Sequence, residues 1–190
     1  MAQATAAENA SDTPPNQGRR RNLVLIGFMG TGKSSVGRRV AESLGFQFVD
    51  TDQMVIKYAG KSIAQIFADE GEERFRELET EALRRCTLAD GQVIATGGGI
   101  VTQPRNHGLL QLAGHVVWLT AKPDTVLDRV SRNHDRPLLQ TDDPLATIRD
   151  LYASRVELYR ACAAEEIDTT NLSLEETAHG LSESARIALG

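Results

Sequence analysis

The chain has 190 residues, of which 41% are hydrophobic and 25% are charged, and this balance predicts one soluble globular domain. The 21 basic and 26 acidic residues leave a net charge of −5, which argues against a broad nucleic-acid-binding face, and no apolar run approaches the ~18 residues of a membrane span. Cys86 and Cys162 are the only cysteines, which excludes a disulfide framework and a cysteine-based zinc site and favours a reducing cytoplasm.

Residues 1–20 are rich in Ala, Asn, Ser, Pro and Gln and contain almost no apolar side chains. They lack the apolar core of a secretory signal, so we expect a disordered tail. The three arginines at 19–21 are then a solvated run rather than a contact for RNA or a membrane. One domain is expected over residues 21–190.

Short apolar runs and amphipathic segments alternate in the first half of that domain. Gly45 marks the end of the first helical pattern, and Ser62 with Gln65 forms a capping box before a later one. In chain order, the sequence predicts a strand over 23–26, a helix over 33–44, a strand over 46–49, helices over about 52–58, 63–69 and 71–89, and a strand over 93–95.

The alternation continues in the second half, where Ser173 and Glu176 form another capping box. The sequence predicts a helix over 104–112, a strand over 115–119, a helix from about 123, a polar stretch over 133–143, a long amphipathic helix over 144–163, a strand over 166–168 and a last helix after Ser173. This rhythm predicts an α/β fold, with a parallel sheet of five strands and helices on both faces. Ligands of such sheets bind at the carboxyl ends of the strands, where the Gly-rich and Asp-rich segments of this chain fall.

Residues 27–34 read Gly-Phe-Met-Gly-Thr-Gly-Lys-Ser, the GxxxxGKS pattern of a phosphate-binding P-loop. The backbone N–H groups of such a loop close around phosphate oxygens at the positive end of the next helix. Lys33 would reach the β- and γ-phosphates, and the Ser34 hydroxyl would bind magnesium. A predicted strand before the loop and a predicted helix after it favour this interpretation over a glycine-rich turn with a fortuitous lysine.

Asp50, Thr51 and Asp52 close the second predicted strand. Side chains at i and i+2 of an extended segment point to the same side, so Asp50 and Asp52 would converge over the P-loop. Asp50 could hold magnesium through water, and Asp52 could take the proton of an attacking hydroxyl. The same tripeptide is also typical of a turn that caps a helix, and in isolation that alternative stays open.

Three glycines, Gly97, Gly98 and Gly99, follow the third predicted strand and would either admit a ligand close to the backbone or form a flexible turn. Arg76 lies among acidic residues, where an arginine is usually a charge on a helix surface. Arg136 and Arg155 have no assignment as isolated arginines.

Six segments of the chain resemble the shikimate kinase family, small P-loop kinases of the nucleoside-monophosphate-kinase type. In order they are GFMGTGKSSVGRRVAESLG, FVDTD, EGEERFRELE, VIATGGG, RPLL and SRVELYR, within a resemblance over about residues 22–189. It implies a P-loop kinase fold with a mobile lid, a monomer, ATP and shikimate as partners, and Mg²⁺ as cofactor. Relatives often have proline at or near Met29 and after the arginine that aligns with Arg155, where this chain has Val156 and Glu157. Neither departure removes a chemical group.

The resemblance also implies a role for each matching residue. ATP would be bound by Gly30, Thr31, Gly32, Lys33, Ser34, Ser35, Arg129 and Arg136. Shikimate would be bound by Asp52, Arg76, Gly97, Gly98, Gly99 and Arg155, with the two arginines on its carboxylate. The metal would be held by Ser34 and, through water, by Asp50. The catalytic residues would be Lys33, Asp52 and Arg136, the last carried by a lid over about 133–143.

The expected reaction is ATP-dependent phosphorylation of the 3-hydroxyl of shikimate, in the pathway to chorismate and the aromatic amino acids, by a cytoplasmic enzyme without nucleic-acid or membrane partners. A gluconate-kinase-like enzyme would share the P-loop and the lid, but it does not account for DTD, TGGG and the paired arginines together. A non-catalytic nucleotide-binding protein would need neither Asp52 nor Arg136.

Overall fold

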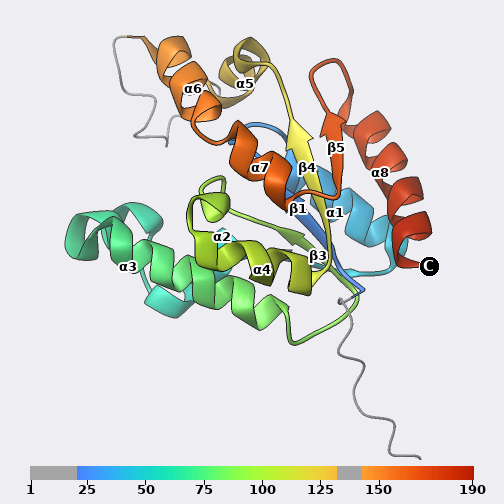
Figure 1. Ribbon diagram of the computed structural model, residues 1–190, viewed down its shortest axis with the longest axis horizontal. Coiled ribbons are helices and arrows are strands. Elements are labelled where there is room, and N and C mark those ends of the chain that lie inside the picture. The colour runs from blue at the N-terminus through green and yellow to red at the C-terminus, as the bar shows by residue number, and fades with distance from the viewer. Residues whose placement is uncertain (1–20, 132–142) are drawn as a thin grey trace, which may run out of the picture.

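Five parallel strands form the centre of the structure (Figure 1). The computed structural model describes residues 21–131 and 143–190. The strands are β1 (Leu23–Ile26), β2 (Gln47–Asp50), β3 (Gln92–Ala95), β4 (His115–Thr120) and β5 (Glu165–Asp168), in the order β2-β3-β1-β4-β5. This sheet confirms the α/β prediction and puts β1, which leads into the P-loop, in the middle.

The two faces of the sheet are packed by different helices, because side chains alternate along each strand. Leu23 and Leu25 of β1 join the apolar cluster under α1 and α8, while Val24 and Ile26 join the cluster under α3, α4 and α7. Figure 1 shows α1 and α8 on one side of the sheet and α3 and α4 on the other. All four β1 side chains are fully buried, as the continuous apolar run predicts.

The helices begin and end close to the predicted positions. Gly45 ends α1 in the left-handed conformation, and both predicted capping boxes are formed, at Ser62 and at Ser173. The helices are α1 (Lys33–Leu44), α2 (Thr51–Ala59), α3 (Ile63–Cys86), α4 (Pro104–Ala113), α5 (Pro123–Val130), α6 (Pro144–Ala153), α7 (Val156–Cys162) and α8 (Leu174–Leu189), with a 3₁₀ turn, η1 (Ile100–Thr102), before α4.

The predicted helix over 144–163 is wrong, because two helices, α6 and α7, meet there at Ser154 and Arg155. Ile148 of α6 packs with Phe28 and α5, whereas Tyr159 of α7 packs on the sheet beside Trp118. The buried side chains of the two helices therefore belong to different clusters. A single amphipathic pattern does not reveal that change of direction.

Candidate active site

The P-loop connects β1 to α1 and forms the floor of a cleft of about 590 Å³ at the carboxyl edge of the sheet. Gly30, Thr31, Gly32, Lys33, Ser34 and Ser35 all line this cleft. The Thr31 hydroxyl donates to the carbonyl of Phe28 at 2.8 Å and so closes the loop on itself. The first N–H groups of α1 lie in this segment, which supplies the positive helix end that phosphates prefer.

The side chain of Lys33 is buried against the backbone of the P-loop. Its Nζ donates to the carbonyls of Gly27 and Phe28, both at 2.8 Å. These contacts satisfy the ammonium with backbone oxygens and hold its positive charge at the floor of the cleft.

Asp50 links the P-loop to α2. Its Oδ2 accepts a hydrogen bond from the Ser34 hydroxyl at 2.9 Å, and its Oδ1 accepts from the backbone N–H groups of Asp52 at 3.0 Å and Gln53 at 3.3 Å. Asp50 is thus both the N-cap of α2 and the partner of Ser34, so the capping alternative is present together with the predicted proximity to the P-loop.

The prediction that Asp50 and Asp52 point to the same side of an extended strand is wrong, although both residues line the same cleft. It assumed extended backbone through both residues, but α2 begins at Thr51 and puts Asp52 in its first turn. Asp52 therefore reaches the cleft from a helix that the Asp50 carboxylate caps. The capped turn, rather than strand alternation, places both residues at the same cleft.

Arg76 lies on α3 with its side chain only 11% exposed, so it is not a surface charge. Its Nη1 contacts Glu79 Oε2 at 2.9 Å and its Nη2 contacts Glu72 Oε1 at 3.0 Å. A methyl group added at Gly99 would lie 2.3 Å from Arg76 Nη1, so the guanidinium packs directly against the glycine loop. Close approach of this arginine requires glycine at position 99.

Arg155 reaches the same loop from the break between α6 and α7. Its Nη1 donates to the carbonyl of Gly98 at 3.4 Å, and its guanidinium carbon lies 5.8 Å from the centre of the Phe28 ring. The structure thus gathers Asp52, Arg76 and Arg155 around Gly97, Gly98 and Gly99, although the three come from three different helical regions. Their convergence forms a site with two guanidinium groups and a carboxylate.

Glu79 is a member of this cluster that sequence reasoning missed. Its side chain is fully buried, and burial, reinforced by the nearby Asp52 charge, raises its pKa to about 7 against the opposing pull of Arg76 and Arg155. A methyl group at Gly97 would lie 2.6 Å from both Glu79 Oε1 and Asp52 Oδ1, so the two carboxyl groups flank that glycine. The sequence offers one sign of this ion pair, because Glu79 follows Arg76 by three residues. Exposed Arg–Glu pairs on α3 have the same spacing, so it does not distinguish a buried pair.

Arg129 and Thr169 form the other end of the cleft. Arg129 donates to the Thr169 hydroxyl at 2.9 Å and to the Thr169 carbonyl at 2.7 Å, and its Nη1 lies 3.4 Å from the carbonyl of Gly30. Sequence reasoning named Arg129 but assigned nothing to Thr169, which ties the segment after β5 to the P-loop through a hydrogen bond to the Thr31 carbonyl at 3.3 Å. Arg136 and the predicted lid, apart from Asp143, lie outside the described residues.

Comparison with known proteins supplies independent information on the chain as a whole. The family model described as shikimate kinase matches residues 29–186. The chain is 48% identical over 157 residues to the shikimate kinase of Symbiobacterium thermophilum, which covers 82% of this chain and 90% of that one. It is 46% identical over 158 residues to the shikimate kinase of Caldanaerobacter subterraneus, covering 83% of this chain and 92% of that one.

Solved structures agree with this result. The shikimate kinase of Acinetobacter baumannii, solved in complex with shikimate, superposes with a TM-score of 0.78 at 40% identity, over 86% of this chain and 89% of that one. A gluconokinase from Sinorhizobium meliloti matches with a TM-score of 0.58 at 18% identity, over 90% of this chain and 95% of that one, which is a likeness of fold alone. Within the described ranges, every helix is too short or too polar to cross a bilayer.

Proposed function

This chain belongs to the shikimate kinase family, and from that membership we propose how its residues carry out the family's reaction. The enzyme transfers a phosphoryl group from ATP to the 3-hydroxyl of shikimate, in the pathway to the aromatic amino acids. Phosphoryl transfer needs little covalent help from a protein and depends on positioning and on positive charge around the transferred group.

The P-loop half of the cleft holds ATP in this proposal. The backbone N–H groups from Gly30 to Ser35 surround the phosphates, and Lys33 gives its charge to the β- and γ-phosphates. To do so, the Lys33 ammonium exchanges its contacts with the Gly27 and Phe28 carbonyls for phosphate oxygens. Arg129, fixed by Thr169, lies against the adenine.

Magnesium fits the donor set beside the P-loop, because Ser34 and Asp50 offer a hydroxyl and a carboxylate oxygen in contact with each other. Ser34 would bind the ion and Asp50 would hold it through water. When bound, the ion neutralises charge on the phosphate oxygens.

The glycine-loop half of the cleft holds shikimate. Arg76 and Arg155 bind its carboxylate with charge-assisted hydrogen bonds, and Gly97, Gly98 and Gly99 allow the ring to approach the backbone. Asp52 orients the 3-hydroxyl and accepts its proton at a carboxylate oxygen. The hydroxyl oxygen forms its bond to the γ-phosphorus as the bond from that phosphorus to the bridging oxygen breaks, and ADP leaves. Residues 21–190 act as one domain and one monomer in the cytoplasm, and Arg136 completes the site from a lid over about 133–143.

The observation that carries this proposal is the closeness of the two halves of the cleft. A methyl group at Gly98 would lie 3.5 Å from both the Gly27 carbonyl oxygen and the Met29 backbone nitrogen, so no more than one methyl group would fit between the glycine loop and the P-loop there. An acceptor held by Arg76, Arg155 and Asp52 is therefore adjacent to the phosphate-binding loop. Adjacent sites for nucleotide and acceptor are what direct phosphoryl transfer requires.

ADP release measured with shikimate, with gluconate and with no acceptor tests the reaction. We expect turnover that depends on shikimate, and little ADP release with either of the other two. Turnover with gluconate would favour the related small-molecule kinase, and nucleotide binding without turnover would favour the non-catalytic alternative. The likeness of fold to the gluconokinase does not favour gluconate, because it comes without matching sequence.

A further inference from the structure

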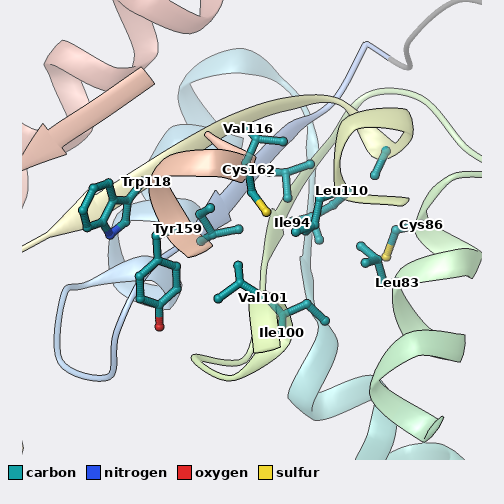
Figure 2. Packing of buried hydrophobic residues seen from close by; sticks show 13 residues of the cluster. Leu83, Cys86, Ile94, Ile100, Val101, Leu110, Val116, Trp118, Tyr159 and Cys162 are labelled. Atoms are coloured by element: carbon teal, nitrogen blue, oxygen red, sulfur yellow. The ribbon is translucent and has the colours of Figure 1, made fainter. Parts of the chain in front are cut away.

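Tyr159 lies beneath the glycine loop and is completely buried. Its ring stacks on Trp118, with ring centres 5.7 Å apart and planes 21° from parallel. Figure 2 shows the two rings side by side, with the Tyr159 hydroxyl directed away from the apolar side chains of the cluster. A phenylalanine ring would fill the same space, so packing does not account for the hydroxyl.

The hydroxyl donates to the carbonyl of Gly98 at 2.5 Å. Burial raises the pKa of the phenol far above its ordinary value, against the opposing effect of the Arg155 guanidinium, which also interacts with the hydroxyl. The group therefore stays a neutral donor at every working pH. The same carbonyl receives the longer, weaker contact from Arg155 Nη1 at 3.4 Å. Tyr159 is thus the stronger of two donors on this oxygen.

Gly98 and Gly99 have few other constraints. In the described residues the loop is held by a bond from the Gly97 N–H to the Thr51 hydroxyl at 3.2 Å and by three bonds with η1. These three run from the Ile100 N–H to the Gly97 carbonyl and from both the N–H and the hydroxyl of Thr102 to the Gly99 carbonyl. None of these bonds holds the peptide between Gly98 and Gly99. In a trans peptide the C=O and N–H bonds point in opposite directions, so a Gly98 carbonyl held by Tyr159 turns the Gly99 N–H away from Tyr159.

We propose that Tyr159 is a positioning residue for the acceptor: its hydroxyl fixes the Gly98–Gly99 peptide and leaves the Arg155 guanidinium available to the shikimate carboxylate. Without this hydroxyl, Arg155 is the remaining donor to the Gly98 carbonyl among the described residues, and the carbonyl competes with the substrate for it. Arg76, packed against Gly99, then faces a peptide whose carbonyl keeps only the longer contact from Arg155. This inference rests on the proposed assignment of Arg76, Arg155 and the glycine loop to shikimate.

Tyr159→Phe tests the proposal, because it removes one oxygen and keeps the ring on Trp118. We expect the Kd and the KM for shikimate to rise about three- to tenfold, the effect of losing one neutral hydrogen bond, while kcat and the KM for ATP stay within about twofold. Trp118 is the only tryptophan of the chain and stacks on the substituted ring, so its fluorescence provides a second titration of shikimate binding.

Tyr152→Phe is the matched control. It also removes a phenol hydroxyl of α6 with a close partner, but that partner is Thr120 Oγ1 of β4, at 2.7 Å, and not the glycine loop. We expect both variants to lower Tm slightly and only Tyr159→Phe to weaken shikimate binding.

An unchanged shikimate Kd in Tyr159→Phe, or an equal rise in both variants, overturns the positioning role. If the wild-type enzyme itself lacked turnover with shikimate, the proposed function would fail instead. The two failures are distinguished by the wild-type assay alone.

Discussion

Two carboxyl groups meet at Gly97 and differ in what surrounds them. Asp52 lines the cleft, whereas Glu79 is buried behind it against Arg76. Burial and a neighbouring carboxylate both stabilise the protonated form of a carboxyl group. A carboxylate that is in contact with solvent and substrate can instead accept a proton. These environments support the proposed role of Asp52 as the base, while Glu79 holds Arg76 in an ion pair.

Asp52→Asn tests the proton acceptor. Asparagine keeps the size of the side chain and one acceptor oxygen but cannot take a proton, so we expect kcat to fall by ~10²–10⁴ with little change in the KM for ATP. Steady-state kinetics with both substrates varied measures this split. A kcat close to wild type would reduce Asp52 to orienting the hydroxyl, in a transition state that needs little base catalysis.

Glu79 makes stability depend on pH. Its pKa is about 7 in the folded chain and 4.5 in the ordinary case, so the fold favours the protonated group. This contribution to the free energy of unfolding is fully present below about pH 4.5 and is lost as the pH rises through about 7. Arg76 and Arg155 oppose the shift and Asp52 reinforces it, and burial is the largest cause.

Glu79→Gln removes this titration. Between pH 4.5 and 7 we expect the wild type to lose stability relative to the variant by on the order of 3 kcal/mol, and above that range we expect the difference to level off. Urea unfolding of both proteins across this range measures the effect. Parallel curves would mean that Glu79 is already ionised throughout.

Helix α3 carries Arg76 and Glu79, and a break at Gly71 separates them from its first turns. Gly71 has φ 82° and ψ 176°, a conformation that is essentially restricted to glycine. The break confirms the two predicted segments on either side of residue 70, although the second ends at Cys86 rather than at 89. It lets Ile66 and Phe75 both face α2.

Gly71→Ala is expected to destabilise the protein by about 1–3 kcal/mol. A methyl group at this position meets no atom within 4 Å, so the cost is in the backbone and not in a clash. Gly180→Ala in α8 is the control: its methyl group also meets open space, but the backbone is helical, and we expect a gain of about 0.5–1 kcal/mol. Urea unfolding should move the two variants in opposite directions, and a stable Gly71→Ala would contradict the argument.

The strand order brings loops that are distant in the sequence to one edge of the sheet. Because β1 lies between β3 and β4, the P-loop is next to the glycine loop on one side and to the ends of β4 and β5 on the other (Figure 1). The ends of the cleft that we propose for the acceptor and for the nucleotide thus lie on opposite sides of one central loop. Closure over such a cleft would exclude water, and the segment proposed for that task joins α5 to α6.

Arg136→Ala tests this closure, although Arg136 lies outside the described residues and its role comes from the resemblance. We expect kcat to fall by ~10³ or more, the effect of losing a cation in the transition state, with no change in Tm in the absence of ligands. Arg149→Ala, at an exposed arginine of α6, is the control and should leave both quantities unchanged. A normal kcat in Arg136→Ala would remove this residue from the mechanism.

Sequence alone determined the parts of this protein that depend on neighbours in the chain. The P-loop, the five strands, the helix caps at Ser62 and Ser173 and the order of the elements follow from local spacing, polarity and turn chemistry. Arg76 and Arg155 were named only through the resemblance, since nothing in their own segments distinguishes them from surface arginines.

Tertiary structure decided which side chains meet and which are buried. Tyr159 and Gly98 are 61 positions apart, Arg129 and Thr169 are 40 apart, and neither pair has a spacing that predicts contact. The break at Arg155, the helical position of Asp52 and the burial of Glu79 arise for the same reason. Each depends on how separate elements pack, because burial and hydrogen-bond partners are properties of the whole sheet-and-helix assembly and not of a local segment.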